Sequence, residues 1–324
     1  MSSAHDPLVL AGVTAPVLRP VRLRPLRRDP LLLDTGHYAH MKDPCPVFDG
    51  RRWHLFATGN TGPGRPHEIL HAIAEELAGP WRLQPPSVLV GVEGDNAAPG
   101  VVAEDGRLHM FIQTSFNTMG GNAEHLVSDD RGARFVRADT ALEGRPGTAE
   151  VGIYDPHPAE ISGRRYLVYA AFSAVGRPDV FLASSRSGSW EGPWDRLGCI
   201  LAHPHVPWHN QHDDPDYEWG LEGPQLLELP EGQILLNATC FLPAVPIRQR
   251  QRVFLALADE PTGPYEVLGP VVPDPGDGPV FENGHATALL HRGRVALVFH
   301  EWTSSDSGWR VRRASAAVGD LLPG

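Results

Sequence analysis

The fold is decided by a short hairpin pattern that occurs first as PVFDGRRWHLF at residues 46–56. An apolar run leads into a turn centred on Gly50, and a second apolar and aromatic run follows it. The Asp-Gly pair supplies the positive φ angles that a tight β-hairpin turn requires. This stretch therefore predicts two antiparallel strands joined by a short turn.

The same pattern recurs four more times along the chain. The further copies are VVAEDGRLHMF (101–111), AEISGRRYLVY (159–169), QLLELPEGQILL (225–236) and ALLHRGRVALVF (288–299). Consecutive turn glycines of the five copies are 56 to 69 residues apart. A pattern that returns at such intervals indicates an internal repeat, in which each copy builds one structural unit.

A second turn signature lies 26 to 31 residues after each of the first four turn glycines. Its sequences are LAGPW (77–81), DRGARF (130–135), WEGPW (190–194) and PTGPY (261–265). Two turns in each repeat, with a short apolar strand before the second, predict four strands per unit. Five four-stranded antiparallel units around an axis make an all-β, five-bladed β-propeller. An open solenoid is the alternative, but solenoid repeats are usually shorter and more regular.

The repeats are not interrupted by any linker-like stretch, so we predict one propeller domain over residues 1–324. Too few residues follow the apolar run at 311–315 to supply a complete last strand. Part of the N-terminal segment 1–42 must therefore complete the fifth blade, and Leu31–Leu33 is the expected strand.

Composition argues against several classes of function. The chain carries 28 Lys and Arg against 39 Asp and Glu, a net charge of −11, which disfavours a nucleic-acid partner. Glycine (34) and proline (32) make up about a fifth of the chain, which suits a turn-rich β protein. No run of 18 apolar residues occurs, so we expect no membrane span. Nothing in the composition predicts the oligomeric state.

The N-terminal residues and the cysteines bear on location. The first 16 residues lack a basic head followed by an apolar run, so we expect no secretory signal and a cytoplasmic protein. The three cysteines, Cys45, Cys199 and Cys240, are odd in number and far apart. They are expected to be thiols and not a disulfide framework.

The starts of the predicted inner strands carry the candidate chemistry. Reading back from each turn glycine gives Asp43-Pro44, Ala98-Pro99, Asp155-Pro156, Glu222-Gly223-Pro224 and Gly284-His285. Because the inner strands of a propeller run in one direction along the axis, we expect the three acids to meet at one end of it. Acid-proline pairs are also ordinary strand starts and turns. A buried carboxylate cluster is costly for structure alone and suits acid/base chemistry such as glycosidic bond cleavage.

At these residues the sequence resembles the five-bladed propeller glycosidases. The resemblance is strongest to glycoside hydrolase family 43, which has families 32, 62, 68 and 117 as relatives. The matching stretches are HMKDP (40–44), YDP (154–156), EGP (222–224) and GH (284–285). They span about residues 40 to 315, and their order and phase together carry the match. The resemblance implies a glycosidase that acts on a small-molecule carbohydrate.

The resemblance also implies roles for individual residues. Asp43 matches the general base that activates water, Glu222 the general acid, and Asp155 the residue that tunes and orients that acid. His285 matches a histidine that lines the axial channel, near the substrate and sometimes near a bound cation such as calcium. His40, in the first matching stretch, is expected to contact the substrate. No other cofactor is implied.

The sequence departs from the family at the second blade. Family members often carry Trp-Ala-Pro-Asp there, whereas residues 96–100 are NAAPG, so an aromatic ring and an acid are missing. We therefore expect a small arabinofuranoside-like or xyloside-like substrate in place of a plant polysaccharide. The acids also lie 7, 8 and 10 residues before their turn glycines. If all three point inward, the extra residues must sit in the turns or in bulges.

The segment 203–214 and two tryptophans each have two interpretations, and Cys45 has one. The histidine-rich segment HPHVPWHNQHDD (203–214) could bind a metal, but its spacing fits no zinc pattern and favours a polar rim loop. Trp208 and Trp219 could stack on a sugar ring or anchor the packing of a loop. Cys45 lies two residues beyond Asp43 and is expected to be a small buried filler.

Three hypotheses of function follow. The first is an inverting glycoside hydrolase. The second is a propeller that binds a carbohydrate or a biosynthetic intermediate without hydrolysis, or performs a different acid/base reaction on it. The third is a retaining fructosidase or an inverting phosphorylase. A phosphorylase needs a cationic pocket, and Arg51-Arg52 and Arg164-Arg165 lie at hairpin turns, on the end of the ring opposite the acids.

Overall fold

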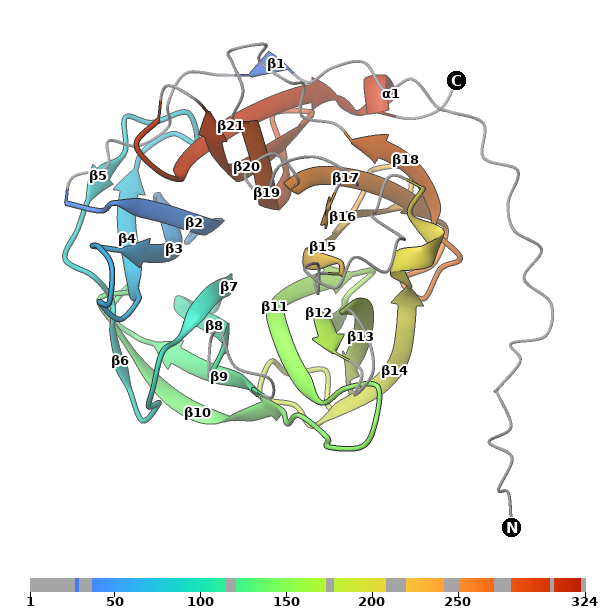
Figure 1. Cartoon of the computed structure of the whole chain (residues 1–324), viewed down its shortest axis with the longest axis horizontal. Helices are drawn as coiled ribbons and strands as arrows, with labels where there is room; N and C mark the ends of the chain where they lie inside the picture. The colour runs from blue at the N-terminus through green and yellow to red at the C-terminus, as the bar shows by residue number, and fades with distance from the viewer. Residues whose placement is uncertain are drawn as a thin grey trace.

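A computed structural model of the chain describes residues 27–28, 37–114, 121–172, 178–207, 220–241, 251–270, 281–303 and 306–321. Five sheets stand around a central axis, and their first strands β2, β7, β11, β15 and β19 face it (Figure 1). The five-bladed β-propeller predicted from the repeat is confirmed. No helix in these described ranges is long and apolar enough to cross a membrane.

The first three blades follow the predicted strand order from the axis outward. Blade 1 consists of β2 (His40–Phe48), β3 (Trp53–Asn60), β4 (Glu68–Ala74) and β5 (Arg82–Leu83). Blade 2 consists of β7 (Ala97–Glu104), β8 (Arg107–Gln113), β9 (Ala123–Ser128) and β10 (Arg134–Leu142), with β6 (Val88–Val90) added parallel to β10. Blade 3 consists of β11 (Gly152–Ile161), β12 (Arg164–Phe172), β13 (Asp179–Ser185) and β14 (Trp194–Leu201).

The last two blades complete the ring. Blade 4 consists of β15 (Glu222–Glu228), β16 (Ile234–Phe241), β17 (Gln251–Ala258) and β18 (Glu266–Pro270). Blade 5 consists of β19 (Phe281–His291), β20 (Arg294–Thr303), β21 (Arg310–Ala317) and the N-terminal β1 (Arg27–Arg28). Two short helices, η1 (His203–His205) and α1 (Val318–Leu321), follow β14 and β21.

The outer strand of blade 5 comes from the start of the chain. Strand β1 runs antiparallel to β21, with Arg27 opposite Ser315 and Arg28 opposite Ala314. The expected strand Leu31–Leu33 lies outside the described residues. The pairing of β1 with β21 joins the two ends of the chain within one sheet, as Figure 1 shows.

Three of the five hairpin turns have positive φ at both turn residues, whereas at Asp49-Gly50 and Glu231-Gly232 only the glycine has it. At Asp105-Gly106, Ser162-Gly163 and Arg292-Gly293 both turn residues have positive φ, between 49° and 80°. This is the signature of a type I′ turn, whose twist matches that of the two strands it joins. The local sequence alone is thus sufficient to set the start of these three blades.

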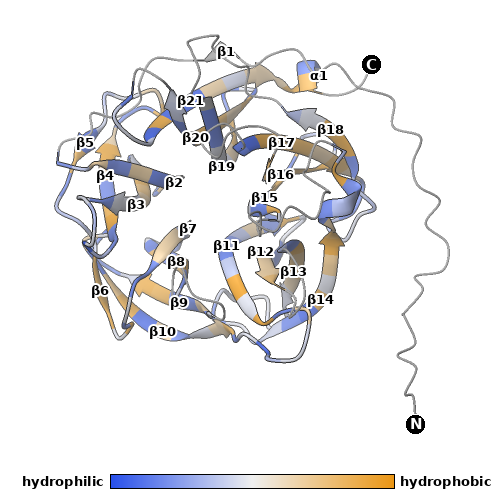
Figure 2. Cartoon of the chain, in the orientation of Figure 1, coloured by the Kyte–Doolittle hydropathy of each residue, from blue (hydrophilic) through white to orange (hydrophobic). Residues whose placement is uncertain are grey.

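Buried apolar side chains fill the seams between blades. Between blades 1 and 2, Phe56 and Ile69 pack against Leu108, Met110 and Phe135, and none of the five is more than 2% exposed. Burial of one such side chain contributes roughly 1.5 to 3 kcal/mol. Figure 2 shows apolar colours along β7 in blade 2, whereas β2, β11 and β19 carry polar stretches. Blade 2, with its apolar inner strand, is the blade that supplies none of the ionisable axial side chains Asp43, Asp155, Glu222 and His285.

Every inner strand carries a bulge at the same height. The pairing shifts between Lys42 and Cys45 in β2, and at the equivalent point of the other four inner strands. One residue of each bulge has a φ of 43° to 53°: Asp43, Ala98, Asp155, Gly223 and His285. Positive φ is strained for every residue except glycine, and such strain clusters at functional sites. The bulges turn these residues toward the axis.

Hydrogen bonds between blades hold the bulges in place. The backbone N–H of Ala98 donates to Thr58 Oγ1 at 2.8 Å, and that of His285 donates to Thr239 Oγ1 at 2.7 Å. The Asp155 N–H donates to Gln113 Oε1 at 3.0 Å in the same way. Each acceptor lies on the second strand of the preceding blade, so each strained residue is fixed by its neighbour in the ring.

Two histidine pairs are buried within blades 1 and 2. His54 Nδ1 lies 2.9 Å from His71 Nε2, and His109 Nδ1 lies 3.0 Å from His125 Nε2. In each pair one imidazole also contacts an aspartate, Asp49 in blade 1 and Asp139 in blade 2. Burial lowers the pKa of His71 and that of His109 to about 4, so both imidazoles are neutral at pH 7.

These histidines predict a loss of stability in mild acid. The unfolded chain takes up protons at a histidine pKa near 6.5, whereas His71 and His109 in the folded chain do so only near 4. The free energy of unfolding should therefore fall between about pH 6.5 and pH 4, by at most about 1.4 kcal/mol per pH unit for each histidine. The free energy of unfolding, measured with urea at several pH values in this range, should fall less steeply with decreasing pH for the double variant His71→Gln/His109→Gln. Equal slopes would contradict this assignment.

Candidate active site

Four ionisable side chains meet where the bulges reach the axis. Asp43, Asp155 and His285 occupy the bulges of β2, β11 and β19, and Glu222 directly precedes the bulge of β15. The second blade contributes only Ala98 to this ring. The structure thus brings together three acids and a histidine that are spread between positions 43 and 285 of the sequence.

His285 is the centre of the cluster. Its Nδ1 lies 2.9 Å from Asp43 Oδ1 and 3.8 Å from Asp155 Oδ2, and its Nε2 lies 3.1 Å from Glu222 Oε2. The four side chains are only 9–15% exposed. Three carboxyl groups therefore surround one imidazole in a largely buried site, where like charges repel and an opposite charge is strongly favoured.

The histidine and Asp43 form an ion pair. Burial alone would lower the pKa of His285, but Asp155 and Asp43 hold that pKa well above its usual value, so the ring is an imidazolium. Burial alone would raise the pKa of Asp43, but the charge and the hydrogen bond of His285 hold it well below its usual range. Asp43 is therefore ionised and able to accept a proton.

Asp155 has the opposite character. Burial raises its pKa to about 6, the carboxyl groups of Glu222 and Asp43 add to the rise, and His285 opposes it. The N–H of Gly223 donates to Asp155 Oδ2 at 2.9 Å, which fixes the carboxyl group beside the start of β15. The site thus holds a carboxylate that accepts protons and a carboxyl group that retains one up to about pH 6.

Gly223 explains why Glu222 lies one position out of phase with the aspartates. A Cβ atom at Gly223 would lie 2.8 Å from Cγ of His285, so the bulge of β15 has no room for a side chain. The acid of this blade comes instead from the preceding residue, and its longer side chain reaches His285 Nε2. The inner strands all carry the same bulge, whereas the turns that follow Phe48, Ile161 and Glu228 contain four, two and five residues. The different spacings therefore lie in the turns, and Gly223, not Glu222, occupies the position equivalent to Asp43.

His300 is a site residue that sequence reasoning missed. The Asp43 N–H donates to His300 Nδ1 at 3.2 Å, and His300 Nε2 lies 3.1 Å from Gln251 Oε1. Burial lowers the pKa of His300 to about 3, so the ring is neutral and carries its proton on Nε2. No motif surrounds this histidine in the sequence, and only the closure of blade 5 onto blade 1 brings it to Asp43.

A further set of residues shares the axial cavity with Asp43, Asp155 and His285. Cys45, Gly100, His157 and Thr287 each follow their bulge residue by two positions. Except for Cys45 they line a cavity of about 30 Å³, enough for about one water molecule. Cys45 Sγ accepts from the Val101 N–H at 3.2 Å and lies 3.6 Å from His157 Nε2. Burial raises the pKa of Cys45 to about 12, so this thiol is the uncharged filler that the sequence predicts.

The other candidate residues have different positions. His40 lies at the start of β2, where its Nδ1 accepts from the Trp309 N–H at 3.3 Å and its ring is 5.6 Å from that of Trp302. Trp208 and Trp219 lie outside the described residues, as does the histidine-rich segment beyond residue 207. His203 is bound to Asp179 Oδ1 at 2.7 Å, in a structural contact between η1 and β13. All three cysteines are free thiols.

His285 is poorly suited to bind the expected calcium ion. Both of its ring nitrogens face carboxyl groups, and an imidazolium has no lone pair to give to a metal. Calcium also prefers six to eight oxygen ligands. Within the described residues no group of three or more His, Cys, Asp or Glu side chains could hold a metal ion.

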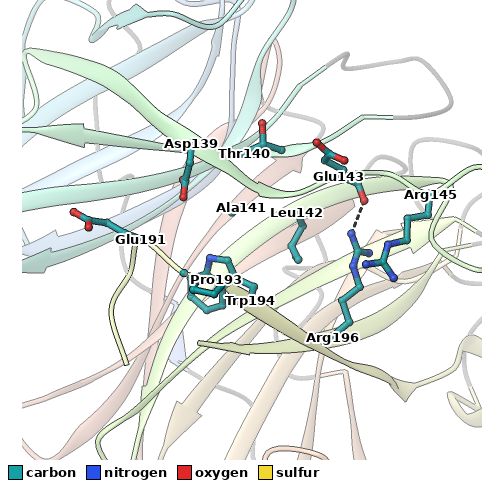
Figure 3. A pocket seen from close by; sticks show the side chains of 11 residues that line it. Asp139, Thr140, Ala141, Leu142, Glu143, Arg145, Glu191, Pro193, Trp194 and Arg196 are labelled. Atoms are coloured by element: carbon teal, nitrogen blue, oxygen red, sulfur yellow. Dashed lines mark hydrogen bonds between the residues drawn. The ribbon is translucent and has the colours of Figure 1, made fainter. Parts of the chain in front are cut away.

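A larger hollow lies at the rim of the ring. It has a volume of about 500 Å³ and is bounded by the end of β10 and the start of β14 (Figure 3). Arg196 crosses its wall, pairing with Glu150 and donating to the carbonyl oxygen of Glu143. None of the four axial side chains lines this hollow, so it is separate from the acid cluster.

Comparison with solved structures places the fold. The endo-arabinase of Bacteroides thetaiotaomicron superposes with a TM-score of 0.67 at 15% identity, covering 90% of this chain and 98% of that one. A family 62 α-L-arabinofuranosidase catalytic domain from Coprinopsis cinerea gives 0.64 at 13% identity, with 90% and 96% covered. The family 32 β-fructofuranosidase of Bombyx mori gives 0.61 at 17% identity, with 90% and 62% covered.

The chain shares the fold of these enzymes. Its sequence matches no family model and no curated protein. At identities of 13 to 17% the likeness concerns the fold and leaves the chemistry to the site itself. The propeller implied by the resemblance to family 43 is thereby confirmed.

Proposed function

We propose that the chain is a glycoside hydrolase that cleaves a small glycoside or oligosaccharide. The observation that carries this proposal is the division of charge in the axial cluster. Asp43 is ionised beside the His285 imidazolium, while Asp155, next to Glu222, holds a proton up to about pH 6. Glycosidic bond cleavage needs one carboxylate and one protonated carboxyl group on opposite sides of the sugar.

The proposed reaction proceeds with inversion. Asp43 takes a proton from a water molecule as the water oxygen attacks the anomeric carbon. The bond to the leaving oxygen breaks, and that oxygen receives the proton of Glu222, which Asp155 helps to hold. Asp43 and Glu222 contact opposite nitrogens of one imidazole ring. Separation by a whole ring favours the roughly 6.5–9.5 Å spacing of inverting enzymes over the roughly 5–5.5 Å of retaining ones.

The proposed substrate carries a pentose. Solved structures with this fold include enzymes named as endo-arabinase and α-L-arabinofuranosidase, and both names refer to the pentose arabinose. The ring position that Ala98 occupies offers neither an acid nor an aromatic ring to hold further sugar units. We therefore infer an arabinofuranoside-like or xyloside-like compound with few sugar units.

A panel of 4-nitrophenyl glycosides tests this proposal. We expect release of nitrophenol from the α-L-arabinofuranoside or the β-D-xyloside. NMR of the first product formed should show the anomeric configuration opposite to that of the substrate. A product of unchanged configuration would refute inversion, and no turnover across the panel would refute hydrolysis.

The pH dependence of the reaction follows from Asp155. Because the pKa of this residue is about 6, kcat/KM should fall as the pH rises above about 6 and the shared proton is lost. On the acid side, kcat/KM should begin to fall only at an unusually low pH, because Asp43 stays ionised far into the acid range. Asp155→Asn cannot ionise, so its profile should lack the alkaline limb near pH 6. A limb that persists in this variant would assign it to another group.

A second candidate function is carbohydrate binding without hydrolysis. It is favoured by the contact of His285 with both catalytic candidates, which occupies their oxygens in the described structure. Under this alternative, crystals soaked in pentoses would show bound sugar at the axis, while the nitrophenyl panel would give no product.

A further inference from the structure

Lys42 is unusual in the sequence. Of the 28 lysine and arginine residues in the chain, it is the only lysine. It directly precedes Asp43, so the one ammonium side chain of the protein is on the strand that delivers the proposed general base. The other 27 of these 28 residues are arginines, and arginines make the guanidinium–carboxylate pairs of the described residues.

The ammonium group of Lys42 makes a cation–π contact with the ring of Trp309, beside the acid cluster. Its Nζ lies 5.5 Å from the ring centroid of Trp309, which is 8% exposed. Within the described part of the chain, no carboxylate lies within 4 Å of this ammonium group. It is near enough to Asp43 and His300 to lower the pKa of both. Among the described residues this cation therefore has an aromatic face but no carboxylate counterion.

Two cations of the neighbouring strand β21 are already bound by other protein groups. Arg312 pairs with Glu301 and Asp306, at 3.0 and 3.2 Å. Arg310 donates to the carbonyl oxygen of Ala39 and to Ser307 Oγ. Both guanidinium groups are bound by the protein itself, so of these three described cations Lys42 is the one left to bind a ligand.

The ligand of Lys42 could be neutral or anionic, and the charges at the site bear on which of the two binds better. With Glu222 protonated as the proposed acid and Asp155 protonated below about pH 6, the charge of Asp43 is balanced by the His285 imidazolium, so the cluster itself does not repel an anion. A neutral sugar gains hydrogen bonds from an ammonium group, whereas an oxyanion gains a charge-assisted bond that is roughly twice as strong. A flexible ammonium group suits a single oxyanion substituent, whereas an arginine would demand a planar, bidentate partner.

We propose that Lys42 binds an oxyanion substituent, a carboxylate or a phosphate ester, on the sugar held at the axis. This proposal rests on the glycosidase function and specifies its substrate class as an acidic glycoside. The Lys42 ammonium group lies over the Trp309 ring, and Lys42 directly precedes Asp43 on β2. The proposal therefore puts the substituent on the side of the sugar from which water attacks.

Matched substrates test the proposal. The 4-nitrophenyl β-D-xyloside and β-D-glucuronide differ only at C5, as do the α-L-arabinopyranoside and β-D-galacturonide. For Lys42→Met we expect the acidic-to-neutral ratio of kcat/KM to fall about 10- to 100-fold within a pair. Lys42→Arg should recover part of the ratio. The control Arg82→Met removes one exposed cation from β5 and should leave the ratio as in the parent.

A binding measurement separates failure of this proposal from failure of the glycosidase function. Calorimetry on Asp43→Asn should show tighter binding of glucuronate, galacturonate or xylose 5-phosphate than of xylose, and added Lys42→Met should remove the difference. The sugar acids and the phosphate ester distinguish the two kinds of oxyanion. If sugar acids bind through Lys42 but no glycoside is cleaved, hydrolysis is refuted and the Lys42 site stands.

Two outcomes would overturn the Lys42 proposal while leaving hydrolysis intact. One is cleavage of neutral glycosides together with rejection of all acidic ones. The other is an equal loss for acidic and neutral substrates in Lys42→Met, with the acid limb of the pH profile moved upward. That result would make Lys42 an electrostatic partner of Asp43, whose other charged or hydrogen-bonding neighbours are His285, His300 and Asp155.

Discussion

Asp43→Asn and Glu222→Gln are each expected to lower kcat/KM about 10²- to 10⁴-fold. The amide introduced by Asp43→Asn cannot take the proton of the attacking water, and the amide introduced by Glu222→Gln cannot protonate the leaving oxygen. Positioned acid and base groups contribute this much to proton-transfer reactions. Both substitutions preserve side-chain size, so the contacts with His285 Nδ1 and Nε2 keep their geometry.

The two variants should also differ from one another. A dinitrophenyl leaving group needs no protonation, so Glu222→Gln should retain most of its activity on that substrate. Asp43→Asn should lose activity on every substrate, because its deficit lies in the attack of water. Glu231→Gln, at an exposed hairpin turn, is the matched control and should behave as the parent. Full activity in both Asp43→Asn and Glu222→Gln would remove the proposed function.

His285→Leu is expected to destabilise the fold by about 3 to 5 kcal/mol. The substitution leaves Asp43, Asp155 and Glu222 without their common counterion, and an unpaired charge in a buried site costs this much. The raised pKa of His285 means that its stabilisation is complete below about pH 6.5 and is lost only as the pH rises through that raised value. Urea unfolding near pH 6 should therefore show the full difference.

His285→Gln separates charge from packing. Glutamine keeps a polar side chain that can donate to one carboxylate, but it carries no charge. The pKa of Asp43 should then rise toward its usual value or above, and the acid limb of kcat/KM should move upward with it. His291→Gln, on the same strand, is the control for a histidine outside the cluster. An unchanged acid limb in His285→Gln would show that the imidazolium does not control Asp43.

The acid cluster was only partly predictable from the sequence. The acid-proline pairs identified Asp43 and Asp155, because they stand at the same phase of a visible repeat. The position of Glu222 was predicted only to within one residue. Gly223 occupies the bulge of this strand, and Glu222 directly precedes it. The spacing of residues along a strand does not reveal where a bulge lies, so this shift became visible only in the paired strands.

His285 illustrates a different limit. The sequence places it on the axis, but its two nitrogen contacts depend on the distances between three blades. The contact of His300 with Asp43 and that of Lys42 with Trp309 had no sequence signal at all, because both depend on how blade 5 meets blade 1. Contacts between residues about 260 positions apart are fixed by ring closure and not by any local pattern.

The sequence by itself determined the propeller, since turns such as Asp105-Gly106 and Ser162-Gly163 act locally and their repetition counts the blades. Only the tertiary structure decided the protonation of the site. Whether a carboxyl group is ionised depends on its burial and on charges a few ångströms away, as the opposite behaviour of Asp43 and Asp155 demonstrates. Both are aspartates followed by proline, but His285 Nδ1 lies 2.9 Å from Asp43 and 3.8 Å from Asp155, and its charge outweighs the effect of burial on the pKa only at Asp43.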